Sequence, residues 1–184
     1  MTVTAASVTL LDEVLPEFDV RSRHARRVHA PPEWVAEAVE TIAPGRVESL
    51  LFRLRGLPVP PGSIRERLSR SAFTVLAERP GVETVAGTFG QFWALRELAH
   101  MEAPTDLEAF RAFDRPVWAK GAISIRIDPL EDGSTEISTE TRVRCVDNAA
   151  RRRFAVYWSI IRILSGWLRR DLLRRIARLA EGDA

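Results

Sequence analysis

Apolar and polar residues alternate along several stretches of the chain, and this pattern predicts β-strands. Between residues 18 and 30 the apolar side chains occupy even positions, whereas Asp19 and most of the arginines occupy odd positions. A period of two residues is typical of a strand that is buried on one face. Two later β-rich runs, 71–78 and 82–92, lie on either side of Arg79-Pro80-Gly81. They predict a hairpin whose second strand can extend towards residue 100.

Two more strands are predicted later in the chain, at residues 118–128 and 134–146. In each of them one set of alternate positions is apolar, including three isoleucines of the first strand. The intervening segment 129–133, Pro-Leu-Glu-Asp-Gly, is typical of a turn. We therefore expect a second hairpin in which each strand has one core face.

Helical periodicity is present in three shorter segments. Residues 32–42 begin with a proline, which is favoured at a helix start, and residues 46–55 form a second amphipathic segment. We expect these two helices to close one end of the sheet. Residues 104–113 predict a short helix inserted over the sheet, with Thr105 and Glu108 as a capping box.

The strongest helical pattern runs from residue 148 to residue 181, and Asp147 is suited to cap its start. One side of this helix carries an apolar stripe, made up of Phe154, Tyr157, Trp158, Ile161, Leu164, Leu168, Leu172, Ile176 and Leu179. The apolar residues that lie off the stripe are Val156, Ile163 and Leu173. We therefore expect parts of the helix to be covered on more than one side. The pattern predicts an α+β fold, in which a curved antiparallel sheet wraps around a long C-terminal helix.

Composition adds that the chain can form one globular domain. Its 184 residues are 46% hydrophobic and 28% charged, which suits a single core and excludes a disordered chain. We assign residues 17–184 to that domain and expect residues 1–16 to be a flexible lead-in, since they lack the basic start of a secretory signal. Cys145 is the only cysteine, so no intramolecular disulfide can form, and no apolar run is long enough to span a bilayer. A cytoplasmic protein is expected.

Charge is distributed unevenly, although the net charge is only +2. Residues 149–184 hold nine arginines and three acids, a net charge of +6, which leaves −4 for the rest of the chain. Five arginines lie away from the apolar stripe of the helix: Arg152, Arg162, Arg169, Arg170 and Arg174. We interpret them as a solvated face, because the acidic remainder nearly cancels their charge, and we expect no nucleic acid partner. The alternative is a surface for anionic lipid or nucleic acid.

Particular residues give the chain a resemblance to a known superfamily. They are residues 30–35 (Ala-Pro-Pro-Glu-Trp-Val), 127–130 with Gly133, and 139–143 ahead of Arg152-Arg153-Phe154 and Tyr157-Trp158. In the order of its elements, the chain over residues 17–181 resembles the helix-grip fold of the START-like superfamily (SRPBCC). It is most similar to uncharacterised bacterial members, of the polyketide cyclase/dehydratase-like kind. The resemblance implies this fold, but the superfamily includes carriers, enzymes and protein-binding domains.

A pocket between the sheet and the long helix would be lined by polar and aromatic residues. His24 has the inward register of the first strand, so it could bind a ligand or transfer a proton. The alternative is a buried histidine paired with a neighbour. The other candidate ligand contacts are aromatic residues around the inserted helix and two small residues of the long helix: Phe92, Trp93, Phe110, Phe113, Trp118, Ser165 and Gly166. Ordinary core packing of the aromatic residues and a kink at the small residues are the competing interpretations.

No catalytic or cofactor motif is found in the sequence. It contains no glycine-rich phosphate or dinucleotide loop, no serine-nucleophile elbow and no zinc-binding pair of histidines. Glu97, His100 and Glu102 match no standard metal-ligand spacing, so we expect no metal and no cofactor. No motif places a base beside Cys145, which is expected to be a small buried hydrophobic residue.

We therefore expect the protein to bind a small hydrophobic or amphipathic molecule between the sheet and the C-terminal helix, as a carrier or a sensor. The first alternative is an enzyme of the polyketide cyclase/dehydratase type that uses the same pocket, with His24 as the candidate acid or base. The second alternative is binding of an anionic lipid surface or of nucleic acid through the basic C-terminal helix, so that peripheral membrane contact stays open. The sequence allows a monomer or a homodimer.

Overall fold

An antiparallel sheet with a long C-terminal helix confirms the expected α+β class. The structure is a computed structural model that describes residues 8–43, 45, 72–94 and 101–182. In chain order the elements are α1 (Leu10–Val14), β1 (Val20–Val28), α2 (Pro32–Thr41), β2 (Thr74–Arg79), β3 (Glu83–Gly90), β4 (Met101–Glu102), α5 (Leu107–Ala112), β5 (Ala119–Pro129), β6 (Thr135–Cys145) and α6 (Asn148–Glu181). The helix expected at 46–55 and the strand extension through 95–100 lie outside the described residues.

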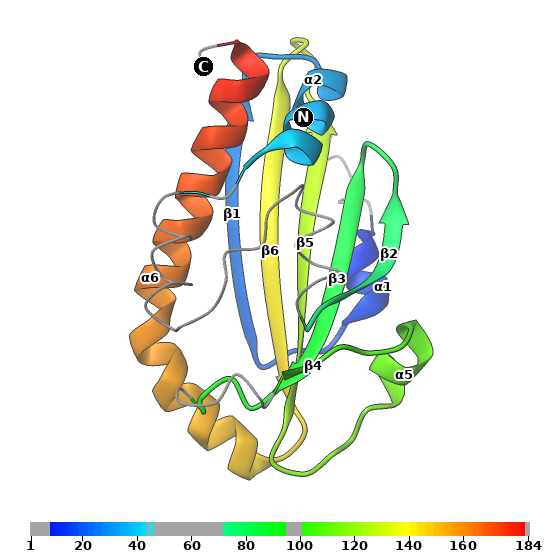
Figure 1. Ribbon diagram of the computed structural model, residues 1–184, viewed down its shortest axis with the longest axis vertical. Coiled ribbons are helices and arrows are strands. Elements are labelled where there is room, and N and C mark those ends of the chain that lie inside the picture. Colours follow the sequence, from blue (N-terminus) through cyan, green and yellow to red (C-terminus); the bar gives the residue numbers. More distant parts are fainter. Residues whose placement is uncertain (1–7, 44, 46–71, 95–100, 183–184) are drawn as a thin grey trace, which may run out of the picture.

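The strands form one curved antiparallel sheet in the order β1-β6-β5-β3-β2, with β4 paired to β3 (Figure 1). Both predicted hairpins are confirmed, because β2 pairs with β3 and β5 pairs with β6. The first strand pairs with the last one, and Val20 lies opposite Val143 while Val28 lies opposite Thr135. This pairing brings β1 next to α6, which follows β6 in the chain.

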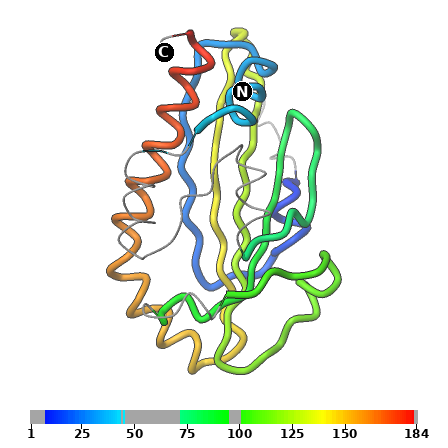
Figure 2. The backbone as a smooth tube through the Cα atoms, viewed as in Figure 1, coloured from blue at the N-terminus to red at the C-terminus, as the bar shows by residue number. Residues whose placement is uncertain are grey.

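α6 is capped at both ends. The Asp147 carboxylate accepts a hydrogen bond of 2.7 Å from the Ala150 N–H, as predicted. Gly182 ends the helix in a left-handed conformation, with φ of 75°, which glycine adopts without a steric penalty. Between these caps the helix extends along the length of the sheet (Figure 2).

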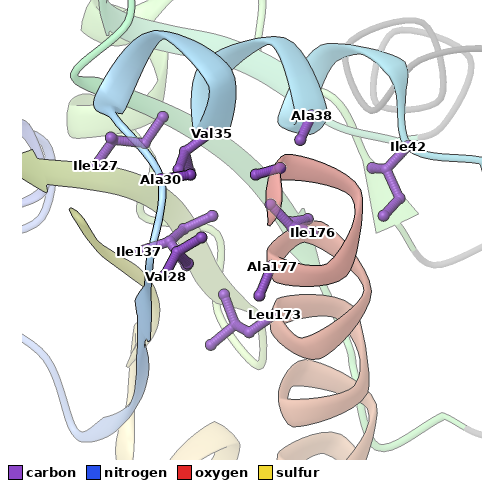
Figure 3. Close-up of a cluster of buried hydrophobic side chains, with 11 residues drawn as sticks. Val28, Ala30, Val35, Ala38, Ile42, Ile127, Ile137, Leu173, Ile176 and Ala177 are labelled. Carbon is purple, nitrogen blue, oxygen red and sulfur yellow. The ribbon is translucent and has the colours of Figure 1, made fainter. Parts of the chain in front are cut away.

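The last turns of α6 pack on β1, β6 and α2 in a buried apolar cluster (Figure 3). Its members are Val28, Ala30, Val35, Ala38, Ile42, Ile127, Ile137, Leu173, Ile176, Ala177 and Ala180. We call this group the α2 cluster. It closes the α2 end of the space between helix and sheet, as expected for the first of the two predicted helices.

The buried face of α6 differs from the predicted stripe. Leu173, which lies off the stripe, is 2% exposed and so is covered as expected, whereas Leu179 of the stripe is 40% exposed. Val156 and Ile163 were expected to be covered, but they are 67% and 72% exposed. The helix has 3.6 residues per turn, so positions spaced three or four residues apart drift gradually around its axis. One straight stripe therefore cannot face a curved sheet along all 34 residues of α6.

The sheet is also covered on the face opposite α6, so the expectation of one core face per strand is wrong. The helix α1 lies in the segment that was expected to be a flexible lead-in, and that expectation is wrong for residues 10–15. Leu11 and Val14 are 1% and 2% exposed, and they pack with Val85 and Ala122 of the sheet. Five residues are too few to show helical periodicity, which is why the pattern did not predict this helix.

Polar groups fix the start of α1. Thr9 and Asp12 form a capping box, and the buried Glu83 carboxylate accepts hydrogen bonds from the Leu10 and Leu11 N–H groups, at 2.9 and 3.3 Å. Burial opposes the ionisation of Asp12, but hydrogen bonds, first among them that from the Thr9 N–H, lower its pKa to about 2. The carboxylate of Asp12 is therefore charged at neutral pH.

Arg142 fixes the end of α1 from the same face of the sheet. Its guanidinium donates to the Leu15 carbonyl at 3.1 Å and pairs with Asp12 and Glu140, each at 2.7 Å. Glu140 in turn accepts two hydrogen bonds from Arg21, at 2.8 and 2.9 Å. The side chains of Arg142 and Glu140 are only 6% and 9% exposed. The buried guanidinium of Arg142 therefore has two carboxylates and a main-chain carbonyl as partners.

The short inserted helix is confirmed as α5, which packs on the same side of the sheet as α1. Its cap is Asp106 rather than Thr105, since the Asp106 carboxylate accepts from the N–H three residues on, at 2.8 Å. Lys120 of β5 donates to the carbonyls of Phe110 and Arg111, at 3.2 and 2.8 Å. Lysine at a helix C-terminus satisfies carbonyls that have no partner within the helix.

Candidate functional site

Polar side chains gather on the face of the sheet that meets α6. The pairing of β1 with β6 places Ser22 opposite Thr141 and His24 opposite Thr139, so these four side chains share one face. From α6, the Arg169 NH1 group donates a hydrogen bond of 3.0 Å to Thr139 Oγ1. We call Ser22, His24, Thr139, Thr141 and Arg169 the inner polar cluster.

This cluster interrupts the apolar packing between sheet and helix. Along β6, Val143 belongs to one apolar cluster and Ile137 to another, and the two threonines lie between them. α6 repeats this order, because Phe154 belongs to the first cluster, Leu173 to the second, and Arg169 lies between. Apolar packing therefore closes both ends of the interface, while its middle is polar.

Arg169 was expected on the solvated side of α6, and that expectation is wrong. Residues 169, 173, 176 and 180 follow the spacing of one helix face, and the last three are buried in the α2 cluster. Although Arg169 as a whole is half-buried, its Nε atom is buried and has no hydrogen-bond partner. Among the described residues no carboxylate pairs with it. Burial lowers the pKa of its guanidinium to about 10, which still leaves a cation at neutral pH.

His24 lies under α6, where strand alternation predicts it. A Cβ atom at Gly166 would come within 3.4 Å of the imidazole Cε1 and Nε2 atoms, so this glycine lets the helix pass close to the ring. Ser22 Oγ is 3.3 Å from Nε2. Burial, followed by the charges of Arg170 and Arg169, lowers the pKa of His24 below its ordinary value of 6.5. A neutral imidazole can donate one hydrogen bond and accept another.

The predicted ligand contacts are divided between the two faces of the sheet. Three of them pack with α1 on the face opposite α6: Phe110, Phe113 and Trp118. There, Phe113 stacks on Phe89 with ring centroids 3.8 Å apart. Two others pack near Phe154 on the α6 side: Phe92 and Trp93. Ser165 and Gly166 lie in the middle of α6, half-buried and buried respectively. Of the predicted contacts, only these two residues and the aromatic pair near Phe154 lie on the same side of the sheet as His24.

Sequence reasoning missed Thr139, Thr141 and Arg169 as members of one site. A signal for the threonines was present, since positions 139 and 141 are polar in a register where 137, 143 and 145 are apolar. No comparable signal existed for Arg169, because the rotation of the buried face of α6 depends on what the helix packs against.

Metal and nucleophile chemistry find little support in the geometry. Where the structure describes the chain, no three His, Cys, Asp or Glu side chains are grouped as a metal ion would need. Glu97 and His100 lie outside the described residues. Cys145 is 3% exposed, and burial, with a further contribution from Asp19, raises the pKa of its thiol to about 12. A thiol with that pKa stays protonated at neutral pH and is a poor nucleophile.

The outward face of α6 carries an exposed apolar row. Val156, Ile160, Ile163 and Trp167 are 67%, 73%, 72% and 39% exposed, and their spacing places them on one side of the helix. We call them the outer row. Exposed arginines flank both ends of the row: Arg152, Arg153, Arg170 and Arg174. Among the helices that the structure describes, none has both the length and the apolar character that crossing a bilayer requires.

A groove of about 300 Å³ lies between α2 and the end of α6. Trp34, Glu37, Ala38, Thr41 and Leu179 are among its lining residues. The lining contains no member of the inner polar cluster, so this groove is not the site that the sequence predicted.

Comparisons with known proteins add no function. No protein-family model matches the chain, and no curated protein matches it. Among solved structures, it is similar to protein CV1439 from Chromobacterium violaceum, with 16% identity and a TM-score of 0.38 over 88% of this chain and 97% of that one. It is also similar to TTHA0849 from Thermus thermophilus, with 13% identity and a TM-score of 0.31 over 90% and 99%. Similarities this weak carry no argument about function, so the case for a function rests on the chain's own geometry.

Proposed function

We propose that this protein binds a small hydrophobic or amphipathic molecule between the sheet and the middle of α6, as a carrier or a sensor, as START-like proteins do. The observation that carries the proposal is the inner polar cluster. Arg169 Nε and Thr141 Oγ1 are buried there without hydrogen-bond partners. A closed protein core satisfies nearly all such atoms, because each unpaired one costs about 1–3 kcal/mol. A ligand that supplies partners would remove this cost.

Apolar surface beside the cluster could receive the rest of the ligand. Ile123 lies opposite Thr141, and Ile125 lies opposite Thr139, on the same inner face of the sheet. Both isoleucines are only half-buried, unlike Ile127 and Ile137 in the α2 cluster. Aliphatic surface next to a few polar groups is the usual composition of a small-molecule site.

The test is a ligand screen by thermal shift and native mass spectrometry, using fatty acids, isoprenoids and aromatic polyketides. A ligand that binds only the folded state at about 100 times its Kd adds about 2.7 kcal/mol of stability. Filling the inner face with Ile123→Trp should abolish the shift, and the matched control Ile160→Trp, on the outward face of α6, should retain it. If no ligand shifts the wild-type protein and Ile123→Trp destabilises it as overpacking does, by about 1–3 kcal/mol, the interior is solid and the proposal fails.

An enzyme of the polyketide cyclase/dehydratase type would use the same site. His24 would then be the acid or base, since it is a neutral imidazole at neutral pH on the inner face. Among the described residues, however, no carboxylate orients its ring. His24→Ala should abolish turnover and spare ligand binding if the histidine is catalytic. A change in stability alone would make it structural.

A second candidate function is docking on an anionic lipid surface through the outer row. The observation that favours it is an exposed apolar row between two pairs of arginines, which suits insertion into a headgroup layer beside anionic lipids. Nucleic acid is a poorer match, because the row offers four apolar side chains where phosphates would lie.

Vesicle co-sedimentation tests this second candidate. Binding to vesicles with anionic phosphatidylglycerol, and not to pure phosphatidylcholine, should be lost in Ile160→Ser/Ile163→Ser and weakened in Arg170→Gln/Arg174→Gln. The pair Arg23→Gln/Arg27→Gln, on exposed positions of β1, serves as the charge control. Absence of vesicle binding at low salt, or salt-sensitive binding to duplex DNA in its place, would refute lipid docking.

A further inference from the structure

We propose that Arg169 is the receptor for a carboxylate group of the ligand, so that the molecule bound is an amphiphile with one negative charge. This inference rests on the proposed function and names the chemical class of its ligand. Arg142 and Arg169 differ in their partners. Arg142 is buried with two carboxylates and a main-chain carbonyl as partners, at 2.7 to 3.1 Å. Arg169 has one threonine hydroxyl and no carboxylate among the described residues.

The missing partner of Arg169 is an anion. A cation that is partly removed from water without a counter-charge loses hydration that a single neutral hydrogen bond does not replace. Lys120, another buried cation, donates to two main-chain carbonyls and so keeps most of its hydrogen bonds. Within the described part of the chain, Arg169 donates one hydrogen bond, to Thr139, and its buried Nε has no partner.

The donors around Arg169 match the shape of a carboxylate. A guanidinium presents Nε and a terminal nitrogen side by side, and this fork binds both oxygens of a carboxylate at once. Thr141 adds a hydroxyl without a partner on the same face, and the neutral His24 ring can donate one more hydrogen bond. Arg169 is the charged member of the inner polar cluster, and one cation balances one negative charge, which favours a carboxylate over a doubly charged phosphate.

The side chains beside the inner polar cluster indicate that the rest of the ligand is apolar. The half-buried Ile123 and Ile125 stand on β5 directly beside the two threonines of β6. A ligand whose carboxylate meets Arg169 therefore places its adjoining carbon atoms against aliphatic side chains. Fatty acids and aromatic acids fit this description, whereas a small anion such as acetate would leave the apolar surface uncovered.

The experiment compares acids with alcohols of equal size, such as dodecanoic acid with dodecanol and 2-naphthoic acid with 2-naphthol, by calorimetry at pH 7.5. The wild-type protein should bind the acid of a pair about 10- to 100-fold more tightly, as expected for a charge-assisted hydrogen-bonded pair. Arg169→Met should reduce this preference to about one while alcohol binding stays within about threefold. The matched control Arg178→Met, at an exposed position of α6, should leave the preference unchanged.

Arg169→Lys separates charge from shape. Because lysine keeps the charge and loses the fork, it should retain only part of the preference for the acid. The thermal midpoint of each variant, measured without ligand, shows whether it folds.

Acids and alcohols that bind equally well to wild-type and Arg169→Met protein would overturn the carboxylate assignment and leave ligand binding standing. A wild-type protein that binds no member of any pair would sink the proposed function itself. If acetate stabilised the protein as strongly as dodecanoate does, the assignment of the ligand as an amphiphile would be refuted.

Discussion

Replacing Arg142 by methionine tests whether α1 is an integral part of the fold. The substitution keeps much of the side-chain volume and removes the guanidinium that holds the end of α1. Lost contacts include the pairs with Asp12 and Glu140 and the hydrogen bond to the Leu15 carbonyl. Glu140 would keep its two hydrogen bonds from Arg21, so it would not be left as an isolated buried charge.

The magnitude follows from the burial of each partner. Removing one partner of a buried ion pair costs about 3–5 kcal/mol, and the side chains of Arg142 and Glu140 are 6% and 9% exposed. The contact that Glu140 retains with Arg21 lowers this figure, and the Asp12 side chain is 40% exposed, so its pair with Arg142 adds little. We expect a loss of about 3 kcal/mol in the free energy of unfolding.

Urea unfolding measures the loss, and hydrogen exchange locates it. The slope of the unfolding free energy against urea should change little, and the amides of Leu10 and Leu11, which donate to Glu83, should exchange faster. The control is Arg144→Met, two residues along β6, whose side chain is 43% exposed and pairs with the exposed Glu17. This control should cost about 0–1 kcal/mol. Equal losses in the two variants, or unchanged exchange of the α1 amides, would refute the view that Arg142 anchors α1.

Three further predictions concern α6 and the strands beside it. Leu173→Ala should cost about 2–5 kcal/mol in urea unfolding, and Leu179→Ala less than about 1 kcal/mol, because the first side chain is 2% exposed and the second 40%. Since burial holds the pKa of folded His24 below 6.5, the unfolded chain binds more protons just below pH 6.5. Stability should therefore fall as the pH drops from about 6.5 to the folded pKa, and His24→Gln should remove this part of the pH dependence in urea titrations at several pH values. Finally, Cys145, with a thiol pKa of about 12, should resist iodoacetamide at pH 8 until urea unfolds the chain; rapid labelling of the native protein would contradict its burial.

Several features of the molecule followed from local sequence alone. The alternation of residues 118–128 and 134–146 predicted a hairpin, and β5 and β6 form it. Asp147 was suited to cap the long helix, and it does. The inward position of His24 also followed from alternation, and its ring meets α6 at Gly166. These predictions succeed because strand alternation and helix capping depend on residues close together in the chain.

Other features depended on which elements meet in space. Arg169 lies on the inner face of α6 because the helix follows a curved sheet, and the strand order β1-β6-β5 determines which threonines face it. The aromatic residues expected in one pocket are divided because Trp118 and Phe110 share the face that α1 covers. Periodicity records which residues share a face of one element, but it does not record what that face packs against. The burial of Arg169 Nε, with no carboxylate beside it among the described residues, was therefore decided by the tertiary structure, and the proposed ligand depends on it.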